Sequence, residues 1–211
     1  MKVFQLKSDF NFQSFYPYDP NDSDSPQVRE LLRADILMGQ ETPRLPSWIP
    51  AHLYPDKPML ERGNFAHLWG FGGFVADSRA CEALRPILEQ SCELLPFLPH
   101  EGEIFHKINV LTIIDCLDMR RTKWRTNRAT GKRLTEIEEY HFIPELLVEG
   151  GLFRLPKRGR TLLTVTGRAG QEDDFRAIVE REGLTGLKFE ELWSENGPPI
   201  RSKSFIDKVL G

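Results

Sequence analysis

Cysteine is scarce in this 211-residue sequence, which holds only three cysteines and no CxxC pair. An odd number without that spacing argues against both a disulfide framework and a zinc module. Reduced thiols are typical of cytoplasmic proteins, and we expect that location here. The three residues are Cys81, Cys92 and Cys116.

Long apolar runs are absent as well. The N-terminal segment MKVFQLKSDFNF has no continuous apolar stretch, so we do not expect it to be a secretory signal. No run elsewhere approaches the roughly 20 apolar residues that cross a bilayer as a helix. We therefore expect neither a membrane span nor a membrane partner.

The sequence also lacks a large excess of positive or negative charge. The net charge is −3 and the sequence pI is about 6.0, whereas general nucleic-acid-binding proteins are usually strongly basic. Glycine motifs that cradle phosphate are also missing, because the FGGF of residues 71–74 fits neither GxGxxG nor GK[ST]. We expect no nucleic-acid partner and no cofactor.

Phenylalanine, in contrast, is abundant at 14 residues, which predicts a core rich in aromatic packing. Apolar patterning predicts strands at residues 2–6, 103–117, 137–143, 161–166 and 187–193, and either a strand or a turn at residues 71–76. It predicts helices at residues 25–37, 79–94 and 171–186. Strands and helices do not alternate strictly, so the expected class is α+β, with a mostly antiparallel sheet and a few helices packed on it.

The expected helices carry recognisable end signals. Ser25 and Ser78 suit N-caps, and Pro86 should kink or shorten the second helix. Glu172, Asp173 and Asp174 are expected in the first turn of the third helix, where the helix dipole favours anions. Gly183 suits the left-handed position after its end.

The chain length fits one domain, residues 1–211. Within it, residues 1–58 are expected to give a strand, a short helix and a proline-rich segment that wraps the body, pinned by Trp48 and Leu53. Residues 59–211 form the α+β body. We expect Trp69 and Trp193 in the core and Trp124, which sits among charges, at the surface.

The stretch TIIDCLDMRRTKWR, residues 112–125, holds the residues that most resemble a catalytic site. Asp115 and Asp118 could bind a divalent cation in a small metal-dependent hydrolase or nuclease. However, residues three apart on a strand face opposite sides, and no third ligand stands out. We favour a structural role, in which these carboxylates accept hydrogen bonds from loop amides or arginines. Cys116 could be a nucleophile served by a histidine, but a buried thiol is the preferred interpretation.

Two stretches could bind a protein partner. The first is a basic connection between the expected strands at 103–117 and 137–143, with Gly131 as its turn and Arg121, Lys123, Trp124 and Arg125 as its candidate contacts. It could also grip phosphate or be a solvated hairpin. The second is an acidic loop with Tyr16, Tyr18 and Asp22, flanked by Asp19 and Asp24. Tyr, Trp and Arg are enriched at binding hot spots, and we favour the basic connection.

Five stretches follow one another in an order that resembles a known family. They are RGNFAHLWGFGGFVADSRACEALRPIL, LLPFLPH, NVLTIIDCLD, GGLFRLP and GLTGLKFEELW. The order resembles immunity protein family eleven of bacterial polymorphic toxin systems, formerly a domain of unknown function typified by a myxobacterial member. The likeness covers roughly residues 60–193, and its most specific pieces are DCLD and GLTGLKF.

The resemblance implies a single immunity-type domain of α+β fold that is not an enzyme. Such a protein binds and neutralises a cognate toxin in the cell that makes it, without a metal or cofactor. The characteristic aromatic and acidic positions of the family would fall here on Phe65, Phe153, Phe189, Asp115 and Asp118. The family often has Asp before the first of these phenylalanines, where this chain has Asn64.

Overall fold

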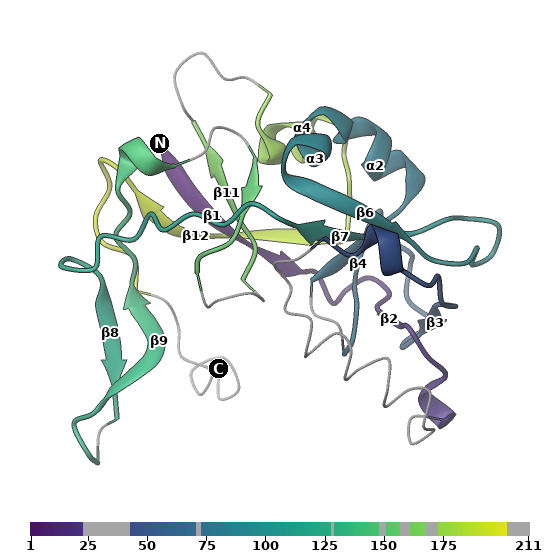
Figure 1. The fold of residues 1–211 in the computed structure, drawn as a ribbon, viewed down its shortest axis with the longest axis horizontal. Coiled ribbons are helices and arrows are strands. Elements are labelled where there is room, and N and C mark those ends of the chain that lie inside the picture. The colour runs from purple at the N-terminus through teal and green to yellow at the C-terminus, as the bar shows by residue number, and fades with distance from the viewer. Residues whose placement is uncertain are drawn as a thin grey trace.

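The computed structural model describes residues 1–22, 43–70, 73–127, 129–147, 151–156, 161–167 and 173–201 (Figure 1). The expected helix at residues 25–37 lies outside these ranges. Twelve strands and three α-helices are found within them, and all neighbouring strands in the sheets pair in antiparallel orientation. The predicted α+β class, with a mostly antiparallel sheet, is therefore confirmed.

The N-terminal strand is central to the first sheet, whose order is β10-β11-β1-β12. β1 (Lys2–Ser8) pairs on one side with β11 (Leu163–Thr166) and on the other with β12 (Leu187–Ser194), and β10 (Leu152–Phe153) extends the β11 side. The strands predicted at 2–6, 161–166 and 187–193 are confirmed. The first strand of the chain and the last described strand are thus paired in one sheet.

The second sheet has the order β4-β5-β7-β6. It consists of β4 (Phe65–His67), β5 (Phe74–Ala76), β6 (Cys92–Pro96) and β7 (His106–Val110). The strand predicted over 103–117 is too long, because the chain leaves this sheet after Val110. Residues 112–114 form backbone hydrogen bonds with Arg154 instead. The Arg154 N–H donates to Thr112 O at 2.9 Å, and the Arg154 carbonyl accepts the N–H of Ile114 at 2.9 Å.

Helix α2 (Ser78–Ala83) and helix α3 (Arg85–Ser91) replace the single helix predicted at 79–94. The break at Leu84 follows from Pro86, which stands in the first turn of α3 and cannot continue α2. The predicted cap is wrong by one residue: Asp77, rather than Ser78, accepts the N–H of Ala80 at 2.8 Å. Residues 92–94 belong to β6 instead.

Helix α4 (Phe175–Arg181) is shorter than the helix predicted at 171–186. Asp174 caps it by accepting the N–H of Ala177 at 2.8 Å, so Asp173 and Asp174 precede the first turn rather than lie in it. Glu172 lies outside the described residues. Gly183 has a φ of 61°, as predicted for the position after the helix. No helix of the described ranges is long and apolar enough to cross a membrane.

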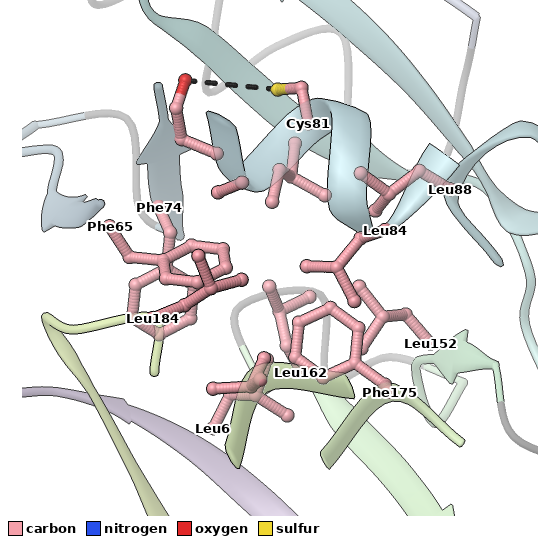
Figure 2. Close-up of a cluster of buried hydrophobic side chains, with 14 of the residues drawn as sticks. Leu6, Phe65, Phe74, Cys81, Leu84, Leu88, Leu152, Leu162, Phe175 and Leu184 are labelled. Atoms are coloured by element: carbon pink, nitrogen blue, oxygen red, sulfur yellow. Dashed lines mark hydrogen bonds between the residues drawn. The ribbon is translucent and has the colours of Figure 1, made fainter. Parts of the chain in front are cut away.

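The largest apolar cluster lies between the three helices and the sheets (Figure 2). Its aromatic members are Phe65, Phe74 and Phe175, surrounded by aliphatic side chains such as Leu84 and Leu152. A second cluster joins Cys116, Leu117, Ile137, Phe142 and Phe153, among others, and a third lies around Phe15, Leu53 and Phe105. The core is as rich in phenylalanine as the composition predicts.

The proline-rich segment is anchored to the body by the two residues predicted for that role. The Trp48 indole N–H donates to Pro96 O at 2.6 Å, and its ring meets Phe97 edge-on. Leu53 is buried. Regular structure in this segment is limited to the 3-10 helix η2 (Leu45–Ser47) and the short strand β3 (Tyr54–Pro55). β3 pairs with β2 (Phe15–Tyr16), and the 3-10 helix η1 (Pro20–Asp22) follows β2 in the chain.

The basic connection proves to be a hairpin of its own. β8 (Lys123–Thr126) and β9 (Arg133–Glu139) pair with each other, and Figure 1 shows them projecting from the rest of the molecule. Gly131 has a φ of 66° in the turn, as expected. The predicted strand at 137–143 meets the end of the 103–117 segment only at the Leu117–Phe142 bridge, just before η3 (Pro144–Leu146).

The tryptophan predictions need correction. Trp69 and Trp193 are half-buried rather than core residues, and Trp124 is half-buried too. The Trp124 ring is covered because the Arg133 guanidinium carbon lies 3.7 Å from its centroid, and because it packs against the second apolar cluster.

Candidate functional site

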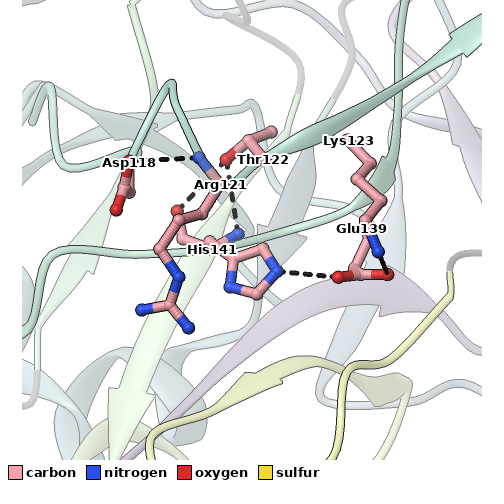
Figure 3. Close-up of polar contacts among 6 residues, drawn as sticks. All are labelled: Asp118, Arg121, Thr122, Lys123, Glu139 and His141. Carbon is pink, nitrogen blue, oxygen red and sulfur yellow. Dashed lines mark hydrogen bonds and ion pairs between the residues drawn. The ribbon is translucent and has the colours of Figure 1, made fainter.

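Asp118 holds the turn that leads into β8. Its Oδ1 accepts the N–H groups of Arg120 at 3.0 Å and Arg121 at 3.2 Å, and its carbonyl accepts those of Arg121 and Thr122 (Figure 3). These are the amide contacts that the sequence predicts for this carboxylate. The side chain is committed to its own turn, whereas the Arg121 guanidinium points away from it.

Asp115 is more exposed than Asp118. It is exposed, and the intervening Cys116 is fully buried, so the chain between the two carboxylates runs through the apolar core. Within the described ranges, no three His, Cys, Asp or Glu side chains form a group that could hold a metal ion. The structure does not bring Asp115 and Asp118 together into such a group.

Removing the Asp118 side chain should lower stability, because the turn amides lose their acceptor. We expect Asp118→Ala to cost about 1–3 kcal/mol and to lower the melting temperature by roughly 2–4 °C for each kcal/mol in a domain of this size. Asp115→Ala is the matched control and should change stability by less than about 0.5 kcal/mol. Thermal denaturation of both variants checks this, and equal melting temperatures would show that the Asp118 contacts do not stabilise the turn.

The three thiols are poorly suited to nucleophilic chemistry. Burial raises the pKa of Cys81 to about 12, that of Cys92 to about 11 and that of Cys116 to about 12. They are therefore protonated at neutral pH, and the thiolate is the reactive form. The preferred interpretation of Cys116 as a buried apolar residue agrees with its exposed fraction of 0%.

Glu139 links the base of the hairpin to the body. Its side chain is 4% exposed and lies 2.9 Å from Lys123 Nζ and 2.7 Å from His141 Nε2 (Figure 3). Lys123 faces Glu139 across the strands, and Thr122 Oγ1 donates to the His141 carbonyl at 3.3 Å. The hydrogen bond with His141, and then that from Lys123, lowers the pKa of Glu139. Sequence reasoning missed this group, although Glu139 and His141 are two residues apart, the spacing that puts side chains on one face of a strand.

The lowered pKa of Glu139 makes part of the stability pH-dependent. A carboxyl whose pKa is lower in the folded state stabilises the fold above its unfolded pKa of about 4.3, and this contribution is lost as the pH falls through the folded pKa. Glu139→Gln should therefore melt below the wild type at about pH 7, and the difference should narrow at about pH 3. Melting curves at both pH values test this against Glu61→Gln, an exposed control. A difference of the same size at both pH values would contradict it.

The predicted contacts of the basic connection divide into two kinds. Lys123 and Arg125 form ion pairs across the hairpin, the latter with Glu136 at 3.3 Å. Trp124 faces Ile137 and is stacked under Arg133. Arg121 and its neighbour Arg120 are exposed, as is Lys132 near the tip. The hairpin is thus held together by some of its cations and presents others to solvent.

The acidic loop proves to be part of a row of aromatic rings. Tyr16 lies 5.6 Å from Tyr18 and is stacked 6.0 Å from Trp69, which in turn is stacked 5.9 Å from Phe10. The row lies where two distant segments meet: the backbone N–H of Trp69 donates to Phe15 O at 2.9 Å, a contact that no sequence signal reveals. The Asp22 side chain and Asp24 lie outside the described residues.

The phenylalanines of the family pattern are structural. Phe65 and Phe153 are fully buried in different clusters. Phe189 is half-buried and meets both Phe4 and Phe175 edge-on, with centroids 6.4 and 6.3 Å away. Phe65 and Phe153 can therefore support a binding surface only through the fold, whereas Phe189 is also partly accessible.

Asn64 uses both ends of its side-chain amide. Its amide N–H donates to Asp77 Oδ2 at 2.8 Å, and its amide oxygen accepts the N–H of Thr185 at 3.0 Å. An amide can do both, whereas a carboxylate only accepts and would face that of Asp77. Asn64 therefore ties the cap of α2 to the loop before β12.

Comparison with known protein families and with curated proteins identified no relative of this chain. No model of a known protein family matches the sequence, and a search of curated proteins found no match. The resemblance to immunity protein family eleven therefore rests on the motifs of this chain and stays a prediction.

Proposed function

We propose that this protein is an immunity-type protein, which binds a cognate bacterial toxin in the cytoplasm and neutralises it without catalysing a reaction. The observation that carries the proposal is the division of roles around residues 115–139. Of the three residues that resemble a catalytic set, Asp118 holds a turn, Cys116 is buried and Asp115 alone is exposed. Exposed cations and a stacked Trp124–Arg133 pair, in contrast, lie together on a projecting hairpin and the turn before it. Aromatic and arginine side chains of this kind are enriched at binding hot spots.

The alternative, a metal-dependent hydrolase or nuclease that uses Asp115 and Asp118, has weaker support. It requires both carboxylates to converge on one site. Asp118 is engaged by the amides of Arg120 and Arg121, and Asp115 is exposed and separated from it in the chain by buried Cys116 and Leu117. The geometry favours binding over catalysis.

Co-expression tests the proposal. The protein is produced together with the toxin encoded by the adjacent gene, and growth of the host is followed. Wild-type protein should restore growth, and so should Asp115→Asn, because no carboxylate chemistry is needed. Failure of the folded wild-type protein to protect would count against the immunity function, and protection lost only in Asp115→Asn would favour the enzyme.

A further inference from the structure

The β8–β9 hairpin concentrates positive charge in an otherwise acidic molecule. The hairpin, residues 123–139, contains five basic and three acidic residues, and the turn before it adds Arg120 and Arg121. Residues 119–139 therefore contain seven basic and three acidic residues, whereas the rest of the chain contains 21 basic and 28 acidic residues. The hairpin also stands away from the body (Figure 1). Charges on the acidic body are screened over about 8 Å at physiological ionic strength, so a projecting segment keeps its own positive potential.

The base of the hairpin is held by contacts that do not use the exposed cations Arg121 and Lys132. Glu139 holds Lys123 and His141, and Trp124 pairs with Ile137, whose side chain is 4% exposed. Arg121 and Lys132 are exposed, and the Arg121 guanidinium points away from the Asp118 turn. These two cations are therefore presented by an ordered scaffold, which lowers the entropy lost on binding.

We infer that this hairpin is a docking surface for an acidic patch on a protein partner, with Trp124 and Arg133 at its centre and Arg121 and Lys132 around them. The inference rests on the proposed function and says which face of the toxin is bound. Guanidinium groups form paired hydrogen bonds with carboxylates, so Asp and Glu side chains are the matching chemistry. Charge complementarity of this kind raises the association rate and selects the partner.

A protein patch fits this surface better than a nucleic acid does. β9 has seven residues, which gives the hairpin a length of roughly 23 Å at about 3.3 Å per residue. A longer phosphate backbone would continue past the hairpin onto the acidic body, where it would be repelled. An acidic patch of limited extent can meet the hairpin alone.

The test uses two charge-reversal pairs of the same composition. Arg121→Glu with Lys132→Glu changes the hairpin, and Arg62→Glu with Lys57→Glu changes cations outside it. Each pair lowers the net charge from −3 to −7. Melting curves first establish that both variants fold. The probes are a fluorescent poly-glutamate peptide and a single-stranded oligonucleotide of equal charge, each titrated at low salt with wild-type protein and both variants.

Wild-type protein should bind the peptide more tightly than the oligonucleotide. The hairpin variant should lose about tenfold or more in affinity for the peptide, because rim charges govern such binding, and the control pair should lose much less. Equal losses in the two variants would show that only net charge matters and would overturn the inference. Preference for the oligonucleotide would assign the hairpin to nucleic acid instead. Neither result depends on toxin neutralisation, so failure here is distinguishable from failure of the proposed function.

Discussion

Gly186→Ala is expected to cost about 4 kcal/mol or more of unfolding free energy, which is exceptional for a single substitution. Gly186 has a φ of 96°, which non-glycine residues rarely adopt. A Cβ there would lie 1.9 Å from Phe65 O and 2.8 Å from Phe65 C. Both atoms belong to the backbone, so no side chain can move to relieve the clash. The strand β4 would have to shift, and with it the hydrogen bond from Phe65 N to Thr185 O.

Gly183→Ala is the matched control for this experiment. Its φ of 61° is also left-handed, but a Cβ there has no heavy atom within 4 Å. The cost should be limited to the backbone conformation, about 1 kcal/mol. Chemical denaturation of the two variants measures the difference. Similar free energies of unfolding would mean that the close approach of Gly186 to Phe65 is not a constraint on the fold.

Phe65→Ala should destabilise the protein by about 3–5 kcal/mol, because it leaves a cavity in the largest apolar cluster. Phe65 is fully buried, and its ring centroid lies 6.3 Å from that of Phe175. Phe10→Ala removes the same ring from a site that is 50% exposed and should cost about 1 kcal/mol or less. Denaturant titration of both variants checks the prediction.

The Phe65 result also bears on the family pattern. If the variant is unstable and loses toxin protection, the loss follows from unfolding, and Phe65 acts through the core. If Phe65→Ala keeps wild-type stability and still loses protection, the residue belongs to the interface, which its burial contradicts.

Local features of the fold could be predicted from the sequence because they depend on neighbouring residues. The break before α3 follows from Pro86, and the turn at Asp118 follows from a carboxylate placed two and three residues before free amides. The cap of α2 was misplaced by one residue because Asp77 and Ser78 are both good caps, and only the Asp77 bond to Ala80 separates them.

Features that depend on distant residues could not be predicted in the same way. The segment 103–117 keeps its β-branched composition after Val110, but its partner changes from β6 to the segment around Arg154. A solvated hairpin is among the interpretations of the basic connection, but the bounds of its strands could not be predicted, because the strands are polar and register shifts on both sides of Trp124 disturb the alternation. The aromatic row of Tyr16, Trp69 and Phe10 depends on a contact between segments more than 50 residues apart.

The stoichiometry of inhibition is the most direct test of the central claim, that this protein acts by binding and not by catalysis. The candidate toxin that the proposal assigns to a neighbouring gene is purified and titrated with purified protein while its activity is measured. A binder should reduce activity in proportion to the amount added, and inhibition should be complete only near equimolar protein. Inactivation of the toxin by a small fraction of an equivalent, increasing with time, would show turnover and would contradict the account.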